Sequence, residues 1–161
     1  MSNYFLGGEF KCPKENGWEC YRQAESKYKF YLSFENAMCR DYVTEKFFTI
    51  YSLNMIPVVL GGANYSAIAP PHSYIDAADF PDPKSLAHYI KLVDSDDAKF
   101  NEYFWWKDFY KRSFHHHQAL CDVCEKLHTS HQPKVYDNMK EWWVDKAECS
   151  STNQVNHRDV I

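Results

Sequence analysis

A polar stretch between two apolar runs carries the side chains whose types and spacing best suit chemistry. It contains Asn36 and Tyr42, and it ends in Thr44, Glu45 and Lys46 at the predicted start of a helix. Asn36 both donates and accepts hydrogen bonds, which suits sugar hydroxyls and phosphate oxygens. Lys46 adds a full positive charge to the partial charge of the first helical N–H groups, and together they would hold a diphosphate.

Two interpretations of this helix start are open on the residues alone. Glu45 in the first turn either complements the helix dipole or accepts hydrogen bonds from the hydroxyls of a bound nucleotide sugar. Thr44, Glu45 and Lys46 also make an ordinary capped helix start, and such capping sequences are common. The secondary structure predicted on either side indicates whether these residues belong to a ligand site.

The apolar runs around this stretch predict a strand, a helix and a second strand. Residues 28–34 and 56–60 are short and rich in apolar or aromatic side chains, which favours strands. Thr44 is a good N-cap for a helix that runs to about Asn54. Ligands of such units bind outside the carboxyl ends of parallel strands. We therefore expect the loop of Asn36 and the glycine pair after residue 60 to share one edge.

The rest of the chain continues the same alternation. A third short strand is predicted near residues 74–76. Further helices are predicted from residue 83, over 97–109, around 118–127 and around 134–144. Strands that alternate with helices indicate an α/β fold, a Rossmann-like parallel sheet with flanking helices. The length of 161 residues fits one domain with a substantial core.

Composition excludes several classes of protein. The net charge is −4 and the Lys and Arg residues are scattered, so no basic face for nucleic acid is expected. No apolar run reaches the roughly 18 to 20 residues that a bilayer requires, and the first residues do not resemble a signal peptide. Aromatic residues make up 17% of the chain, which suits a dense core or a surface that docks another domain.

The cysteines and one sequon point to an oxidising compartment. The six cysteines form an even set that is consistent with disulfides, although their pairing is open on sequence alone. A bridge between Cys12 and Cys20 would close the N-terminal segment on itself. Asn64 begins an N-glycosylation sequon, which agrees with a lumenal address. We expect this chain to be a piece of a longer protein whose N-terminal part carries the targeting segment.

Several motifs together resemble one enzyme family. FYLSFEN, DYVTEK, PVVLGG and DFPDPKSLAHYI are similar to the donor domain of the glycosyltransferase family ten α1,3-fucosyltransferases. The strings GGANYSAIAPPHSYI and ALCDVCEKL are most similar to the invertebrate type that acts on the N-glycan core. The resemblance implies the C-terminal, GDP-fucose-binding half of a GT-B fold. It divides the chain into a loop-rich segment (1–27), a donor-binding domain (28–146) and a polar frayed tail (147–161).

The resemblance also implies roles for particular residues. Asn36, Tyr42, Glu45 and Lys46 match donor-site positions, with Lys46 neutralising the pyrophosphate of GDP-fucose and Glu45 holding ribose or fucose hydroxyls. Such a transfer needs no bound metal, because a lysine and helix N–H groups stabilise the charge of the leaving GDP. The family's phosphate-binding arginine has no clear equivalent, since Arg22 and Arg40 are the only nearby candidates and neither is assigned.

The implied function is inverting transfer of L-fucose from GDP-fucose to N-acetylglucosamine of N-glycans. In the family, an N-terminal acceptor domain supplies the general base and contacts the glycan, and an N-terminal anchor holds the enzyme in the Golgi membrane as a type II protein. The alternative is a non-catalytic fragment that binds GDP-fucose without the acceptor domain and its base.

The remaining cysteines allow two interpretations. Cys121 and Cys124, with His128 nearby, supply half of a familiar zinc pattern, whereas a structural zinc needs four ligands. The secretory setting that the resemblance implies favours disulfides instead, with partners in the rest of the protein. Cys39 belongs to the same set of candidate disulfide cysteines.

Overall fold

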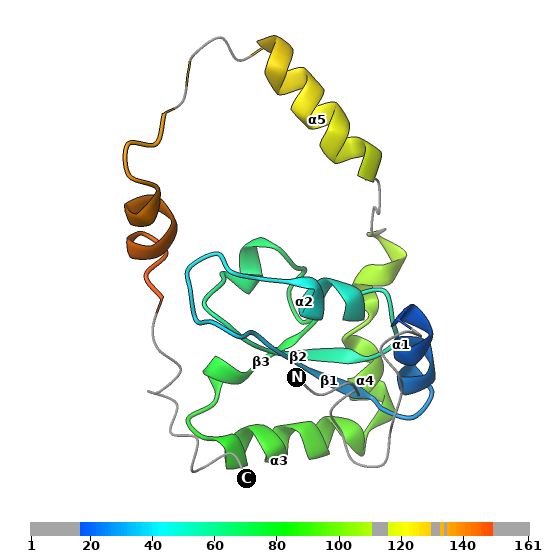
Figure 1. The fold of residues 1–161 in the computed structure, drawn as a ribbon. Coiled ribbons are helices and arrows are strands. Elements are labelled where there is room, and N and C mark those ends of the chain that lie inside the picture. Colours follow the sequence, from blue (N-terminus) through cyan, green and yellow to red (C-terminus); the bar gives the residue numbers. More distant parts are fainter. Residues whose placement is uncertain (1–16, 111–115, 130–132, 134, 150–161) are drawn as a thin grey trace.

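The computed structural model describes residues 17–110, 116–129, 133 and 135–149. Within them, a three-stranded parallel sheet is covered by helices on both faces (Figure 1). The α/β fold with a parallel sheet and flanking helices is therefore confirmed. No helix in the described part of the chain is both long and apolar enough to cross a membrane.

The sheet has the strand order β1-β2-β3, with β1 at Phe30–Phe34, β2 at Ile56–Leu60 and β3 at Ile75–Asp76. Phe34 lies opposite Leu60 in the register of β1 and β2, and Val59 lies opposite Asp76 in that of β2 and β3. The three carboxyl ends consequently lie side by side. This arrangement brings the loops that follow the strands to one edge.

Strand β2 is the centre of the core because its alternating side chains reach both faces. Ile56 and Val58 are fully buried in the cluster beneath α3 (Pro83–Asp94) and α4 (Asp97–Glu102). Val59 points to the other face, where it joins the cluster around Phe47 of α2 (Glu45–Ile50). Burial on both faces explains why the sequence of β2 is an uninterrupted apolar run.

The predicted helix starts rest on capping side chains. Asp82 accepts a hydrogen bond from the Ser85 N–H at 2.7 Å, and Pro83 occupies the first turn of α3. Asp96 does the same for α4, accepting from the Ala98 N–H at 3.0 Å. Each cap satisfies a backbone donor that has no partner inside its helix.

Four expectations about elements are corrected. A helix, α1 (Gly17–Glu25), forms in the segment predicted to be loop-rich, because Cys20 and Ala24 are buried and Ala24 packs in the cluster around Ile50. Helix α2 ends at Ile50, before the predicted end near Asn54. The helix predicted over 97–109 is two elements, α4 and the 3₁₀ turn η4 (Trp105–Asp108). In place of the helix predicted over 134–144, the structure has the short π-helical turn η5 (Glu141–Asp145).

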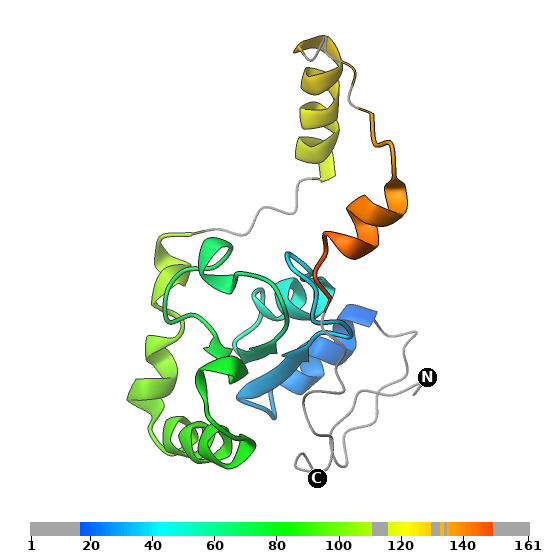
Figure 2. The same ribbon diagram turned by 90° about the vertical axis from the view of Figure 1, so that its left-hand side faces the viewer.

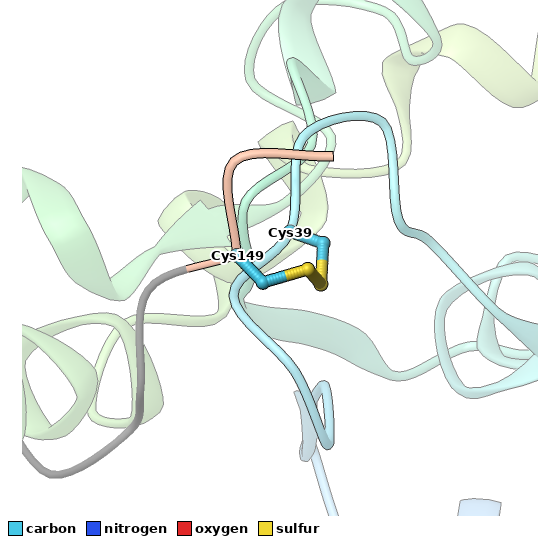
Figure 3. The surroundings of a disulfide bond; sticks show 2 residues. All are labelled: Cys39 and Cys149. Carbon is cyan, nitrogen blue, oxygen red and sulfur yellow. A yellow bond between two sulfur atoms is a disulfide. The ribbon is translucent and has the colours of Figure 1, made fainter. Parts of the chain in front are cut away.

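The C-terminal part forms an arm that leaves the body and returns to it. Helix α5 (His116–Thr129) stands away from the sheet in both views (Figures 1 and 2), and Leu120 and Leu127 are exposed on it. The arm returns at Cys149, which forms a disulfide with Cys39 in the loop after β1 (Figure 3). Within the tail predicted to fray from residue 147, the described end is therefore fastened.

Short 3₁₀ turns complete the carboxyl edge of the sheet. The turn η2 (Tyr65–Ala67) follows the glycine pair after β2, and η3 (Ala77–Asp79) follows β3 directly. The Asp76 carboxylate caps η3 by accepting the Ala78 N–H at 2.9 Å. These turns hold the chain close to the edge where a ligand is expected.

Candidate functional site

The four predicted donor-site residues lie together in the segment from the end of β1 to the first turn of α2. Asn36 and Glu45 are exposed, and Tyr42 retains 37% of its accessible surface. Lys46 is partly buried, with its side chain 26% exposed. The segment therefore carries three accessible polar side chains and one cation that is partly sheltered from solvent.

A buried carboxylate that the sequence did not single out organises this segment. The side chain of Glu35 has no exposed surface. Its Oε1 accepts the Thr44 N–H at 2.7 Å, and both carboxylate oxygens accept from the Thr44 hydroxyl at 3.0 and 2.9 Å. The Lys46 ammonium lies 3.4 Å from Oε2. Because a buried charge requires such compensation, Glu35 fixes where Thr44 and Lys46 lie.

Lys46 is shared between two carboxylates and a hydroxyl. Its Nζ lies 3.1 Å from the Thr44 Oγ1 and 3.6 Å from a carboxylate oxygen of Glu45. Burial lowers the pKa of Lys46, but Glu35 and Glu45 raise it by more, so the net pKa is above its ordinary value. The ammonium is therefore charged at neutral pH.

Two backbone N–H groups at the start of α2 already have hydrogen-bond acceptors within this segment. The Thr44 Oγ1 accepts the Lys46 N–H at 3.5 Å, and the Thr44 carbonyl accepts the Phe47 N–H at 3.2 Å. The helix has only six residues, so its dipole is small. We attribute most of the positive character of this edge to the Lys46 side chain.

The glycine pair after β2 allows two close approaches that a side chain would block. A β-carbon on Gly62 would collide with the backbone of Cys39, in the loop after β1. A β-carbon on Gly61 would lie 2.5 Å from the Tyr65 hydroxyl and 3.2 Å from Glu35 Cγ. The two glycines thus let the donor-site loop and Tyr65 pack directly against the end of β2.

Tyr65 is a second feature of this edge that the sequence did not single out. It is 2% exposed, and burial, followed by the nearby Glu35 and Asp76 charges, raises the pKa of its phenol to about 12. The hydroxyl therefore keeps its proton at neutral pH. The sequence signal for Tyr65 was only its place just after a glycine turn at the expected ligand edge. The signal for Glu35 was a carboxylate directly after a predicted strand.

Comparisons with known proteins give the family of the chain. A sequence model described as Glycosyltransferase family 10 (fucosyltransferase) C-term matches residues 5–142. The chain belongs to glycosyltransferase family 10.

Individual relatives show how much of their own length this family 10 chain covers. It is 42% identical to the Alpha-(1,3)-fucosyltransferase C of Drosophila melanogaster, over 82% of this chain and 31% of the relative. It is 38% identical to the Glycoprotein 3-alpha-L-fucosyltransferase A of the same fly, over 98% and 33%. With a human 4-galactosyl-N-acetylglucosaminide 3-alpha-L-fucosyltransferase, FUT5, it shares 38% identity over 74% and 33%. The chain spans about a third of the length of these relatives.

The two arginines considered for phosphate binding in this family 10 chain either pair with other charges or lie exposed. Arg40 forms ion pairs at 3.7 Å with Asp41 and with Glu148 of the returning arm, and Arg22 is exposed on α1. Neither is assigned to phosphate binding.

Asn64 of the sequon is exposed, and its Oδ1 accepts the Ser66 hydroxyl at 2.7 Å. Its glycosylation stays a prediction.

The cysteines divide into bonded and free sets. Cys39 pairs with Cys149, which was not among the residues chosen from sequence. Cys20 is also disulfide-bonded, while the predicted partner Cys12 lies outside the described residues. Cys121 and Cys124 are free and exposed on α5. Among the described residues no group of three or more potential ligands could hold a metal ion.

Proposed function

We propose that this chain is the donor-binding half of an α1,3-fucosyltransferase and that it binds GDP-fucose at the carboxyl edge of the sheet. The observation that carries the proposal is the buried Glu35 carboxylate, which holds Lys46 at that edge. Family membership supplies the reaction class. A cation at the carboxyl end of parallel strands suits the binding of a nucleotide diphosphate.

Lys46 acts on the leaving group of the transfer. As the bond from fucose to the β-phosphate breaks, negative charge grows on the GDP oxygens. An ammonium group that has turned to the bound diphosphate before the bond breaks stabilises this charge without further reorganisation, and its effect is larger because the site is partly sheltered from water. The raised pKa of Lys46 keeps it protonated throughout the reaction.

The exposed side chains around Lys46 orient the donor. Glu45 accepts hydrogen bonds from ribose or fucose hydroxyls, and Asn36 binds a hydroxyl pair or a phosphate oxygen. Burial raises the pKa of Glu45, but its own backbone N–H and Lys46 lower it by more, so Glu45 is ionised and acts as an acceptor. Tyr42 packs its accessible ring beside the nucleotide and offers its hydroxyl.

The acceptor and the compartment form the rest of the proposal. The full-length enzyme transfers L-fucose with inversion to N-acetylglucosamine of N-glycans, in line with the glycoprotein named for one fly relative. The general base belongs to its acceptor-binding part. Its address is the Golgi lumen, in which the disulfide between Cys39 and Cys149 would persist.

Calorimetric titration of the purified, oxidised chain tests the donor site. GDP and GDP-fucose should both bind, and UDP and its sugars should compete poorly. Lys46→Ala should weaken GDP binding by at least about tenfold, since a hydrogen bond to a charged group contributes roughly 1.5 to 3 kcal/mol. Lys46→Arg should retain part of the affinity because it keeps the charge.

The matched control is Lys99→Ala, which removes another ion-paired lysine, bonded to Asp96 on α4. It should leave binding unchanged. Equal affinity of wild type and Lys46→Ala for GDP, in samples with the same circular dichroism, would refute the proposed site. Preference for a different nucleotide sugar would instead indicate another transferase of the same architecture.

A further inference from the structure

The Tyr65 hydroxyl is a buried hydrogen-bonding group that has no partner among the described residues. Its ring is fixed by aromatic neighbours, with its centroid 5.4 Å from that of Phe47 and 5.7 Å from that of Tyr74. Burying a hydroxyl without a partner is unfavourable, whereas phenylalanine would fill the same apolar space without that cost. A tyrosine that served packing alone would thus gain nothing from its oxygen.

The hydroxyl lies next to the carboxylate that holds Lys46. A β-carbon on Gly61 would lie 2.5 Å from the Tyr65 oxygen and 3.2 Å from Glu35 Cγ, so both groups border the same small space. Asp76, the other acid near the phenol, already accepts the Ala78 N–H. The absence of a side chain at Gly61 is what allows the phenol and Glu35 to come this close.

Glu35 depends on Lys46 for part of its compensation. Its carboxylate is held by two donors of Thr44 and by the Lys46 ammonium at 3.4 Å. When Lys46 turns to a bound diphosphate, the buried carboxylate loses that cation. A buried charge that loses a partner is strongly destabilised unless another donor replaces it.

We propose that Tyr65 is a positioning residue of the donor site, whose hydroxyl donates to the Glu35 carboxylate when Lys46 moves from Glu35 to the diphosphate. This inference rests on the proposed function, because it requires a diphosphate at Lys46. Tyr65 touches no substrate. It lowers the free energy of the bound state by replacing the donor that Glu35 loses. This role explains why the Tyr65 hydroxyl has no partner among the described residues in the nucleotide-free protein.

The test combines two measurements on Tyr65→Phe. In the absence of nucleotide, denaturant unfolding should show stability equal to or above that of wild type, because an unpartnered hydroxyl is removed. The Kd for GDP should rise by about tenfold, the effect of losing one hydrogen bond to a charged group. In the Lys46→Ala background Tyr65→Phe should change the Kd little, since no ammonium leaves Glu35.

Tyr51→Phe is the matched control. Tyr51 packs on the same Phe47 ring, with centroids 4.7 Å apart, but its hydroxyl is bonded to Ser73. This substitution should lower stability and leave the GDP affinity unchanged. The pair of variants separates a hydroxyl that serves the fold from one that serves binding.

The outcomes distinguish the two proposals. If wild type binds GDP and Tyr65→Phe binds it within about twofold of wild type, the role of Tyr65 is overturned while the donor site stands. A loss of nucleotide-free stability in Tyr65→Phe would also overturn it, because the hydroxyl would then have a partner in the fold. If wild type does not bind GDP at all, the donor site fails and the role of Tyr65 fails with it.

Discussion

Cys149 is bonded to Cys39, 110 positions earlier in the chain, so the returning C-terminal arm is fastened to the loop that carries Asn36 and Tyr42 (Figure 3). A hydrogen bond from the Arg40 N–H to the Ala147 carbonyl at 2.7 Å supports the same junction. The donor-site loop is therefore held by covalent and polar contacts to the arm, in addition to its packing on the end of β2.

Removal of this disulfide should destabilise the fold and weaken donor binding. Because the bond closes a long loop, Cys149→Ser should lower the free energy of unfolding by about 2 to 4 kcal/mol. GDP should bind more weakly because the loop of Asn36 loses its restraint. Urea unfolding and calorimetry on the oxidised protein measure both effects.

The free thiols on α5 provide the control for that experiment. Cys121→Ser with Cys124→Ser removes two exposed cysteines that form no disulfide within the described residues, so stability should change by less than about 0.5 kcal/mol. Identical unfolding curves for wild type and Cys149→Ser would show that the disulfide contributes nothing to the stability of the fold.

The two glycines after β2 should differ in whether a second substitution can rescue them. At Gly61 the closest atom to an added β-carbon is the Tyr65 hydroxyl oxygen, and at Gly62 it is a backbone oxygen of Cys39. Both Gly61→Ala and Gly62→Ala should cost about 1 to 3 kcal/mol through overpacking. Tyr65→Phe should recover much of the loss at Gly61, because the obstructing oxygen is gone.

At Gly62 no side-chain change can relieve the collision. Tyr65→Phe should therefore be additive with Gly62→Ala, and thermal unfolding of the single and double variants checks the coupling. Equal coupling of Tyr65→Phe to both glycine substitutions would contradict the assigned contacts.

Sequence reasoning succeeded where local patterns decide structure. The run 56–60 is short and apolar, Thr44 was visible as a cap, and a helix was expected from residue 83, so β2 and the starts of α2 and α3 were predicted correctly. It failed where distant contacts decide. Helix α1 depends on packing around Ala24, which no local periodicity reveals.

The candidate site shows the same division. Lys46 and its neighbours stand in one continuous stretch, so their proximity followed from the chain itself. The central role of Glu35 depends on burial and on contacts across nine to eleven residues, and the approach of Tyr65 depends on folding of the glycine turn. Burial and orphaned hydrogen-bonding groups are properties of the folded state, so a list of residue types could not supply them.

Alkaline pH should destabilise the protein through its buried phenols. Burial raises the pKa of Tyr51 and of Tyr65 from 10.0 to about 12. Above pH 10 the unfolded chain releases these protons while the folded chain keeps them, so the stability present below pH 10 is lost as pH rises toward about 12. Each group contributes about 2 to 3 kcal/mol to this loss.

Urea unfolding across this interval, with tyrosinate absorbance as a second signal, measures the decline. Tyr65→Phe and Tyr51→Phe should each make it shallower, whereas Tyr110→Phe, which removes an exposed hydroxyl, should not. A decline of the same slope in all variants would mean that these phenols do not titrate differently in the folded and unfolded states.

Lys107 connects the aromatic segment after α4 to the turn that follows α2. Its Nζ donates to the Leu53 carbonyl at 2.7 Å and to the Asn54 Oδ1 at 2.8 Å, and it lies 4.7 Å from the centre of the Phe104 ring. Burial lowers the pKa of Lys107, because the charged ammonium loses solvation, and these hydrogen bonds must offset that loss. The contacts give it a structural role.

Lys107→Met keeps the apolar stem and removes the ammonium, so it should lower the free energy of unfolding by about 1 to 3 kcal/mol because the Leu53 carbonyl loses its side-chain donor. Nucleotide affinity should not change, since these contacts lie in the turn after α2, whereas Lys46 lies in the first turn of that helix. Lys91→Met, on the exposed side of α3, is the control and should alter neither quantity. A large loss of GDP affinity at full stability would instead assign Lys107 to the donor site.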